Sequence, residues 1–139
     1  MKIVICVHNL ANGGAERVAA LWAEGFASDG NEVHMVTCEP NARVDYDISK
    51  SIFRHLIYSE GNPLKRYFGK VSQLRRLIKE LHPDVAIAVL YPWNFWLLMA
   101  TIGLDVPVIN TQHDSFERPD TAPMLLRTKI PGCVPWPWG

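Results

Sequence analysis

The chain has few cysteines and no excess of charge of either sign. Its 139 residues include three cysteines, and 14 basic side chains balance 14 acidic ones. Cys6, Cys38 and Cys133 lie far apart and form no CxxC pair or Cys/His cluster with zinc spacing. We therefore expect reduced thiols in a cytoplasmic protein. The balanced charge gives no overall field to recruit nucleic acid, so nucleic acid is not an expected partner.

The sequence also lacks a recognisable targeting segment. Residues 1–8 carry one lysine and a short apolar run, with no small-residue cleavage site, and are interpreted as a strand. Residues 86–104 contain no charged side chain and are about as long as a membrane span. Pro92 and Asn94 interrupt that stretch, which favours a buried strand, a turn and a buried helix over a spanning helix.

Strand and helix patterns alternate along one domain. With 48% hydrophobic residues, the chain is long enough for a single core but not for a second full domain. Apolar runs predict strands at 2–7, 32–38, 84–90 and 106–111, with a mixed segment at 52–58 as a further candidate. Helical spacing marks apolar faces at Ala15, Val18, Ala19, Trp22 and Phe26, and again within 64–81 and 93–102. This alternation predicts an α/β fold, a Rossmann-like parallel sheet with helices on both faces, over residues 1–120.

The last segment, residues 121–139, departs from this pattern. Its final ten residues hold three prolines and two tryptophans, a composition unsuited to a helix or a central strand. We expect an irregular tail, which belongs either to an altered copy of something longer or to an unstructured end.

Two adjacent glycines, Gly13 and Gly14, follow the first strand and open a helix. Without side chains they allow a ligand to approach the backbone, and the helix start favours a phosphate. The loop matches neither the G-x-G-x-x-G nor the G-x-x-x-x-G-K-[ST] motif. A tight turn that needs glycine for its shape alone is the alternative interpretation.

Three motifs carry a family resemblance. Asn-Gly-Gly-Ala-Glu-Arg-Val at 12–18, His-Pro-Asp-Val at 82–85 and Pro-Val-Ile-Asn-Thr-Gln-His-Asp at 107–114 resemble family-4 glycosyltransferases of bacterial surface polysaccharide and oligosaccharide synthesis. The resemblance covers about residues 1–118. It implies the N-terminal, acceptor-side half of a GT-B enzyme, in which two Rossmann-like domains face a cleft.

The resemblance further implies a retaining transferase that needs no metal or other cofactor. It would move sugar from a nucleotide-sugar donor, such as a UDP-sugar, to a glycan or polyprenyl-linked acceptor. Gly13 and Gly14 would approach the donor diphosphate, with Glu16 and Arg17 beside them, and His113 would lie at the reacting centre. Asn12, Asp114 and Trp93 are acceptor-side candidates.

Each candidate also has a purely structural interpretation. His113 at a strand end is a common hydrogen-bonding cap, Asp114 is suited to capping the next turn, and Asn12 to capping the helix. Glu16 and Arg17 resemble solvated first-turn residues. His8 is interpreted as a packed histidine. Four aromatic side chains have two possible interpretations, as the lining of an acceptor groove or as ordinary core residues: Tyr91, Trp93, Phe95 and Trp96.

The predicted helix at 64–81 carries six lysines and arginines against one glutamate, Glu80. Such a face is either an ordinary solvated surface or a peripheral contact with the inner face of an anionic membrane. Because the relatives glycosylate lipid-linked acceptors, the resemblance favours membrane contact.

Nothing in the 139 residues corresponds to the basic pair and Glu-x7-Glu element with which the family grips the nucleotide sugar. The donor-binding C-terminal domain is thus missing from this sequence, and we expect the chain alone to be inactive. Two alternatives stay open: a non-catalytic acceptor-binding module or remnant, and a nucleotide-dependent oxidoreductase. The oxidoreductase would use Glu39, after the second strand, to bind a ribose.

Overall fold

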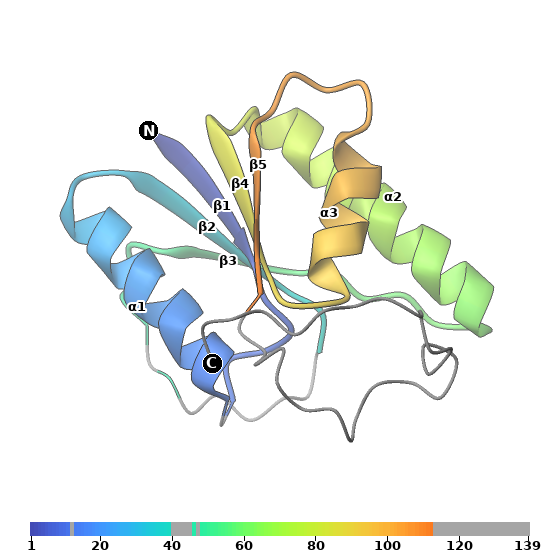
Figure 1. The fold of residues 1–139 in the computed structure, drawn as a ribbon, viewed down its shortest axis with the longest axis horizontal. Helices are drawn as coiled ribbons and strands as arrows, with labels where there is room; N and C mark the ends of the chain where they lie inside the picture. Colours follow the sequence, from blue (N-terminus) through green and yellow to red (C-terminus); the bar gives the residue numbers. More distant parts are fainter. Residues whose placement is uncertain (12, 40–45, 47, 113–139) are drawn as a thin grey trace, which may run out of the picture.

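The computed structural model of the chain describes residues 1–11, 13–39, 46 and 48–112. Within these residues the predicted α/β fold is confirmed, with strands and helices that alternate as expected (Figure 1). The strands are β1 (Lys2–Cys6), β2 (Glu32–Thr37), β3 (Phe53–Leu56), β4 (Val85–Val89) and β5 (Val108–Thr111). The helices are α1 (Gly14–Ser28), α2 (Pro63–Leu81) and α3 (Trp93–Thr101).

All strand pairs are parallel, in the order β3-β2-β1-β4-β5. The chain builds outward from β1 through β2 to β3, and then returns to the other side of β1 to place β4 and β5. Ile3 of β1 thus pairs with both Val33 of β2 and Val85 of β4. The reversal of strand order creates a topological switch point between β1 and β4.

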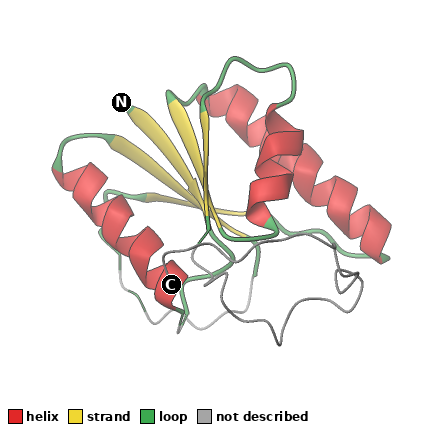
Figure 2. Ribbon diagram, in the orientation of Figure 1, coloured by secondary structure: helices red, strands yellow, loops and turns green. Residues whose placement is uncertain are grey.

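Helices cover both faces of the sheet, α1 on one face and α2 and α3 on the other (Figure 2). On the α1 side of the core, the buried side chains of that helix are the alanines Ala15, Ala19, Ala20 and Ala23, and Trp22 and Phe26 pack against the same core partly buried. The opposite side receives larger ones, including Leu74, Ile78 and Leu97. Because β1 is buried on both faces, its sequence is apolar without alternation.

Helix α2 has clear signals at both ends. The Asn62 side chain accepts from the Lys65 amide at 2.8 Å, and Pro63 is the first helical residue. His82, in the left-handed conformation at φ 48°, ends the helix before Pro83. The predicted apolar face is only partly correct: Leu74 and Ile78 are buried, but Leu64 and Phe68 are 66% and 60% exposed.

The uncharged stretch 86–104 forms β4, a turn and α3, as the sequence predicts. The turn contains a cis Tyr91–Pro92 peptide bond. Among the described residues, no helix combines the length and apolar character that crossing a bilayer requires.

One of the six basic residues of α2 has an internal role. Arg75 extends to the end of α3, where its Nη1 donates to the carbonyls of Ala100 at 2.8 Å and Ile102 at 2.7 Å. A cation is favourable at the carboxyl end of a helix, because carbonyls there lack helical partners. Arg75 therefore joins the two helices and is not a simple solvated side chain.

A histidine pair links β2 and β3. The His34 side chain is 6% exposed; its Nε2 lies 2.8 Å from Glu32 Oε1 and its Nδ1 lies 2.9 Å from His55 Nε2. The hydrogen bond from His34 helps to keep the pKa of Glu32 below its usual value, and burial lowers the pKa of His55. These bonds satisfy an imidazole that lies in an otherwise apolar layer.

Two adjacent leucines of α3 test the assignment of the core. Leu97 is 0% exposed and packs in the core between the sheet and α2, whereas Leu98 is 48% exposed. Leu97→Ala should lower the free energy of unfolding by about 2–5 kcal/mol, because it leaves a cavity. Leu98→Ala should change it by about 0.5 kcal/mol. Urea denaturation followed by circular dichroism measures both; equal losses would show that the packing of α3 is misassigned.

Candidate functional site

The switch point between β1 and β4 defines the candidate site. Ligands of open parallel sheets bind outside the carboxyl ends of the strands at such a point. At this edge lie the loop that follows β1, described at residues 8–11 and 13, and the turn that follows β4, residues 90–92. Leu90 in that turn has φ 66°, and its amide donates to the Thr111 carbonyl at 3.2 Å. A left-handed leucine is strained, and strain of this kind gathers at functional sites.

Gly14 occupies the first position of α1 and is exposed to solvent. A Cβ built on it would meet no atom of the described chain within 4 Å, and its φ is outside the left-handed region. Neither backbone conformation nor packing among the described residues therefore requires glycine here. This departs from the turn interpretation, in which glycine is needed for shape.

Gly13 is more enclosed. It is the N-cap of α1 in an ordinary extended conformation, φ −109° and ψ 149°. The Tyr46 hydroxyl donates to its carbonyl at 3.1 Å, and the Glu16 carboxylate folds over it, so that a Cβ on Gly13 would contact that carboxylate. Arg17, one residue on, is exposed. The structure thus places Gly13, Gly14, Glu16 and Arg17 together at one helix start.

The structure describes the start of α1 and the end of β5, next to the predicted residues Asn12, His113 and Asp114. The prediction that Asn12 caps the helix is wrong, because the N-cap is Gly13. Asn12 itself, His113 and Asp114 lie outside the described residues. The strand that leads to His113, β5, ends at Thr111, at the same edge as the glycine pair. With β4 between them, β1 and β5 are about 10 Å apart at strand spacing.

Trp93 cannot line an acceptor groove in this structure. Its side chain is 1% exposed and packs in the core beneath α3. Its neighbours differ: Tyr91 is 77% and Phe95 48% exposed. Trp96 is half-buried, with the Lys70 amine 4.8 Å from its ring centroid. The prediction of Trp93 as an acceptor-side residue is therefore wrong, because the helical turn directs that ring into the core.

His8 is not the packed histidine that the sequence suggests. Its side chain is 52% exposed, and it lies between the ends of β1 and β2. The His8 Nδ1 atom is 3.3 Å from Cys38 Sγ, and Nε2 is 3.5 Å from Glu39 Oε2. Asn9 donates from Nδ2 to the same Glu39 oxygen at 2.8 Å. These four side chains form a polar cluster on the carboxyl edge, beside the glycine pair.

The thiols near this edge are not activated. Burial raises the pKa of Cys38, and the nearby Lys70 opposes that rise while Glu39 adds to it. Burial likewise raises the pKa of Cys6, which is fully enclosed in the sheet. Since thiols with a raised pKa are poor nucleophiles, neither cysteine is suited to covalent catalysis.

Sequence reasoning missed Asn9 entirely and considered Glu39 only as a ribose ligand. Asn9 Oδ1 accepts from the Ala11 amide at 3.0 Å, so both ends of its amide group are engaged. A polar residue directly after each of two neighbouring parallel strands is a signal that could have predicted this contact.

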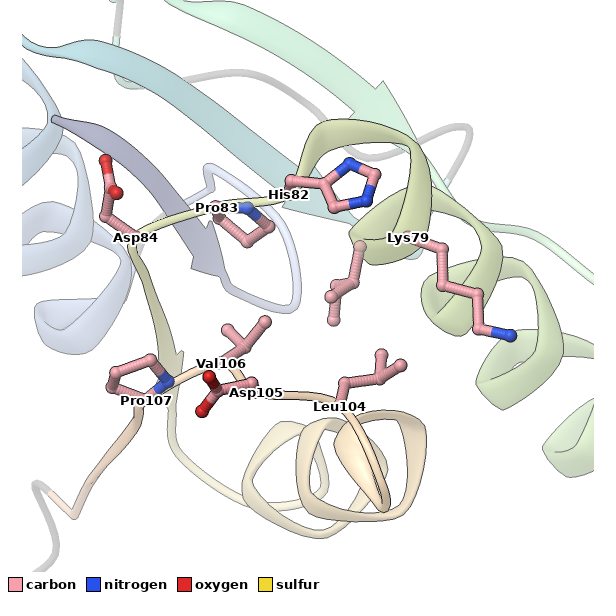
Figure 3. Close-up of a pocket in the computed structure, with 9 residues that line it drawn as sticks. Lys79, His82, Pro83, Asp84, Leu104, Asp105, Val106 and Pro107 are labelled. Carbon is pink, nitrogen blue, oxygen red and sulfur yellow. The ribbon is translucent and has the colours of Figure 1, made fainter.

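A hollow also lies elsewhere among the described residues. It has a volume of about 500 Å³ and is found at the opposite, amino edge of the sheet, between the end of α2 and the residues that precede β5. Ile78 lines it, and Figure 3 shows Leu104 and Val106 around it, while the Lys79 amine and the Asp84 carboxylate point away. Asp84 accepts from the Lys2 amide at 2.6 Å. His82 and Asp105 also line this hollow, but it lies at the edge opposite to the one where parallel sheets bind ligands, which makes it a weak candidate for a catalytic site.

The described residues hold no group of three or more histidine, cysteine, aspartate or glutamate side chains placed to bind a metal ion. The carboxyl edge instead offers helix-start amides, two glycines, and a carboxylate held by histidine and asparagine. These groups suit the binding of a phosphate next to a hydroxyl-rich molecule.

Comparison with known proteins places this architecture in a family. The model of Glycosyltransferase Family 4 matches residues 12–136, which reaches beyond the residues that carry the motifs. A Campylobacter jejuni protein, GalNAc-α-(1→4)-GalNAc-α-(1→3)-diNAcBac-PP-undecaprenol α-1,4-N-acetyl-D-galactosaminyltransferase, is 26% identical over 144 residues. The match includes 96% of this chain but 38% of that relative, so the chain spans well under half of the relative's length. The chain, with its parallel sheet and glycine-opened first helix, belongs to Glycosyltransferase Family 4.

Proposed function

We propose that this chain is the acceptor-side half of a retaining glycosyltransferase that moves a sugar from a nucleotide-sugar to a glycan or lipid-linked acceptor. UDP-sugars are the favoured donors, and no metal or other cofactor is required. The observation that carries the proposal is Gly14, an exposed glycine at the switch point that the described chain does not need for its own packing.

The chemistry of glycosyl transfer explains why a glycine is useful at this position. When the glycosidic bond to the donor breaks, negative charge develops on the departing diphosphate and positive charge on an oxocarbenium-like sugar. The unpaired amides at the start of α1 stabilise the diphosphate, provided that no side chain keeps it at a distance. His113, which follows the last residue of β5 by two positions in the sequence, would act on the donor sugar.

Glu16 restrains this site. Its carboxylate folds over Gly13 and competes for the helix start with any diphosphate. On donor binding it would turn outward toward solvent, while Arg17 in the same turn offers a compensating cation. Asn12 and Asp114 remain acceptor-side candidates in this proposal.

The proposed acceptor is based on the Campylobacter jejuni relative, whose name includes a saccharide linked to undecaprenyl diphosphate. A lipid-linked substrate requires the enzyme to work at a membrane surface. The start of α2 suits such a contact, because exposed Leu64 and Phe68 lie beside Lys65 and Arg66. We propose cytoplasmic, peripheral contact with the inner leaflet through this end of the helix.

The first test concerns the chain by itself. Binding a sugar nucleotide in a GT-B cleft takes two walls, so the purified 139-residue chain should show no transfer from UDP-sugars to undecaprenyl diphosphate-linked glycans. Adding or fusing a donor-binding domain from the adjacent coding sequence should restore it. Radiolabelled sugar transfer measures this; transfer by the chain alone would overturn the half-enzyme proposal.

A substitution at Gly14 distinguishes a role in donor binding from a role in the fold. Gly14→Ala should leave the free energy of unfolding unchanged or raise it by up to about 1 kcal/mol, because alanine favours the helix. In the complete enzyme it should lower kcat/KM at least roughly tenfold, since the methyl group holds the diphosphate away from the amides. Gly25→Ala, at another exposed α1 position with open space around its Cβ, is the matched control. Equal activity of both variants would leave the glycine pair without a role in donor binding.

Two lysines of α2 test the proposed membrane contact. Lys65→Glu, at the exposed start of the helix, should weaken binding to phosphatidylserine-containing vesicles roughly thirtyfold, because it changes the charge by two units and each unit near the surface is worth about 1 kcal/mol. Lys79→Glu, at the exposed far end, should change binding little. Vesicle co-sedimentation measures both. Equal losses would point to net charge alone and contradict contact through this end.

A further inference from the structure

The carboxyl edge carries a second ionic group that the diphosphate proposal does not use. Glu39 follows β2, and its side chain is 46% exposed. Its Oε2 atom accepts from Asn9 at 2.8 Å and lies 3.5 Å from His8 Nε2. Oε1 has no hydrogen-bond partner among the residues that the structure describes. The Glu39 carboxylate is thus held in place through Oε2, and Oε1 is left to accept a hydrogen bond from a ligand.

The supports of this carboxylate are themselves fixed. Asn9 Oδ1 accepts from the Ala11 amide, which sets the direction of Nδ2 toward Glu39. On the other side, His8 Nδ1 meets Cys38 Sγ at 3.3 Å, and Cys38 is buried at 4% exposure. If the thiol donates to Nδ1, the imidazole proton is on Nε2, directed at the carboxylate. Glu39 is therefore pre-oriented before any ligand arrives.

The loop after β1 sets the position of Glu39 relative to the glycine pair. Asn9 and Gly13 belong to one connection, whose Leu10 is buried and whose Leu10 carbonyl accepts from Tyr46, the residue that also bonds Gly13. Glu39 thus borders the region where a diphosphate would meet α1. We do not expect it to bind that diphosphate, because two anions repel each other.

A fixed carboxylate beside an anion site selects neutral hydrogen-bond donors. Sugar hydroxyl and N-acetyl N–H groups fit, and hydrogen bonds to a charged acceptor are stronger than neutral ones. In glycosyl transfer the attacking hydroxyl must come within roughly 3–3.5 Å of the anomeric carbon, so the acceptor sugar must lie next to the donor diphosphate. We propose that Glu39, positioned by His8 and Asn9, binds hydroxyl groups of the acceptor glycan and helps to determine acceptor specificity.

This inference rests on the proposed function, but its test uses binding by the chain itself. Amide signals of the isotope-labelled 139-residue chain are followed by NMR during titration with methyl α-glycosides of glucose, galactose, N-acetylglucosamine and N-acetylgalactosamine. At least one glycoside should shift the signals of Asn9 and Glu39. Glu39→Gln keeps the shape of the side chain and should weaken that binding roughly 10- to 100-fold.

Glu80→Gln is the control, since Glu80 is 65% exposed, at the far end of α2, and its contact with Arg76 is a weak 3.7 Å pair. It should leave glycoside binding within about twofold of the parent chain. Thermal unfolding checks that each variant folds. In the complete enzyme, Glu39→Gln should raise the KM for the acceptor and leave the KM for the donor unchanged.

UDP and NAD distinguish the possible failures. UDP should bind the complete enzyme equally tightly with Glu39 and with Glu39→Gln; absence of UDP binding to the complete enzyme counts against the proposed function alone. If none of the glycosides binds the chain, or if they bind Glu39→Gln as tightly as the parent, the acceptor role of Glu39 is overturned. NAD binding that depends on Glu39 would also overturn it, in favour of a ribose-binding carboxylate.

Discussion

The parallel pairing of β1 with both β2 and β4 is the constraint on which the site depends. Backbone hydrogen bonds on both sides of β1 fix it at the centre of the sheet, with Ile3, Val4 and Ile5 paired on each flank. The loops after β1 and β4 must then diverge to opposite faces, because α1 and α3 cover opposite faces. The glycine pair, the strained Leu90 and the Glu39 cluster all owe their positions to this arrangement.

The fold could be predicted because local signals and burial agree. The apolar runs of β1, β2 and β4 lie between turn residues, and each proved to be buried on both faces. Strand order, by contrast, follows from long-range pairing that no local pattern records. The carboxyl edge could still be anticipated as the site, since every strand of a parallel sheet ends there.

Individual side chains were harder to predict because their exposure depends on tertiary packing. Trp93 and Phe95 lie in similar sequence surroundings, two residues apart in the same helix. The first side chain nevertheless lies in the core and the second at the surface. His8 seemed to be core because it follows five buried residues, but the strand has ended and its ring turns toward Glu39. Neither outcome can be inferred from helix or strand periodicity alone.

The alanine face of α1 has a consequence for the glycine loop. The buried side chains of α1 are all alanines, Ala15, Ala19, Ala20 and Ala23, so at these positions the helix backbone lies close to the sheet. A larger side chain at any of them must displace the helix outward, and its first turn with it. The distance between the helix start and the sheet is thus set by methyl groups spread over two helical turns.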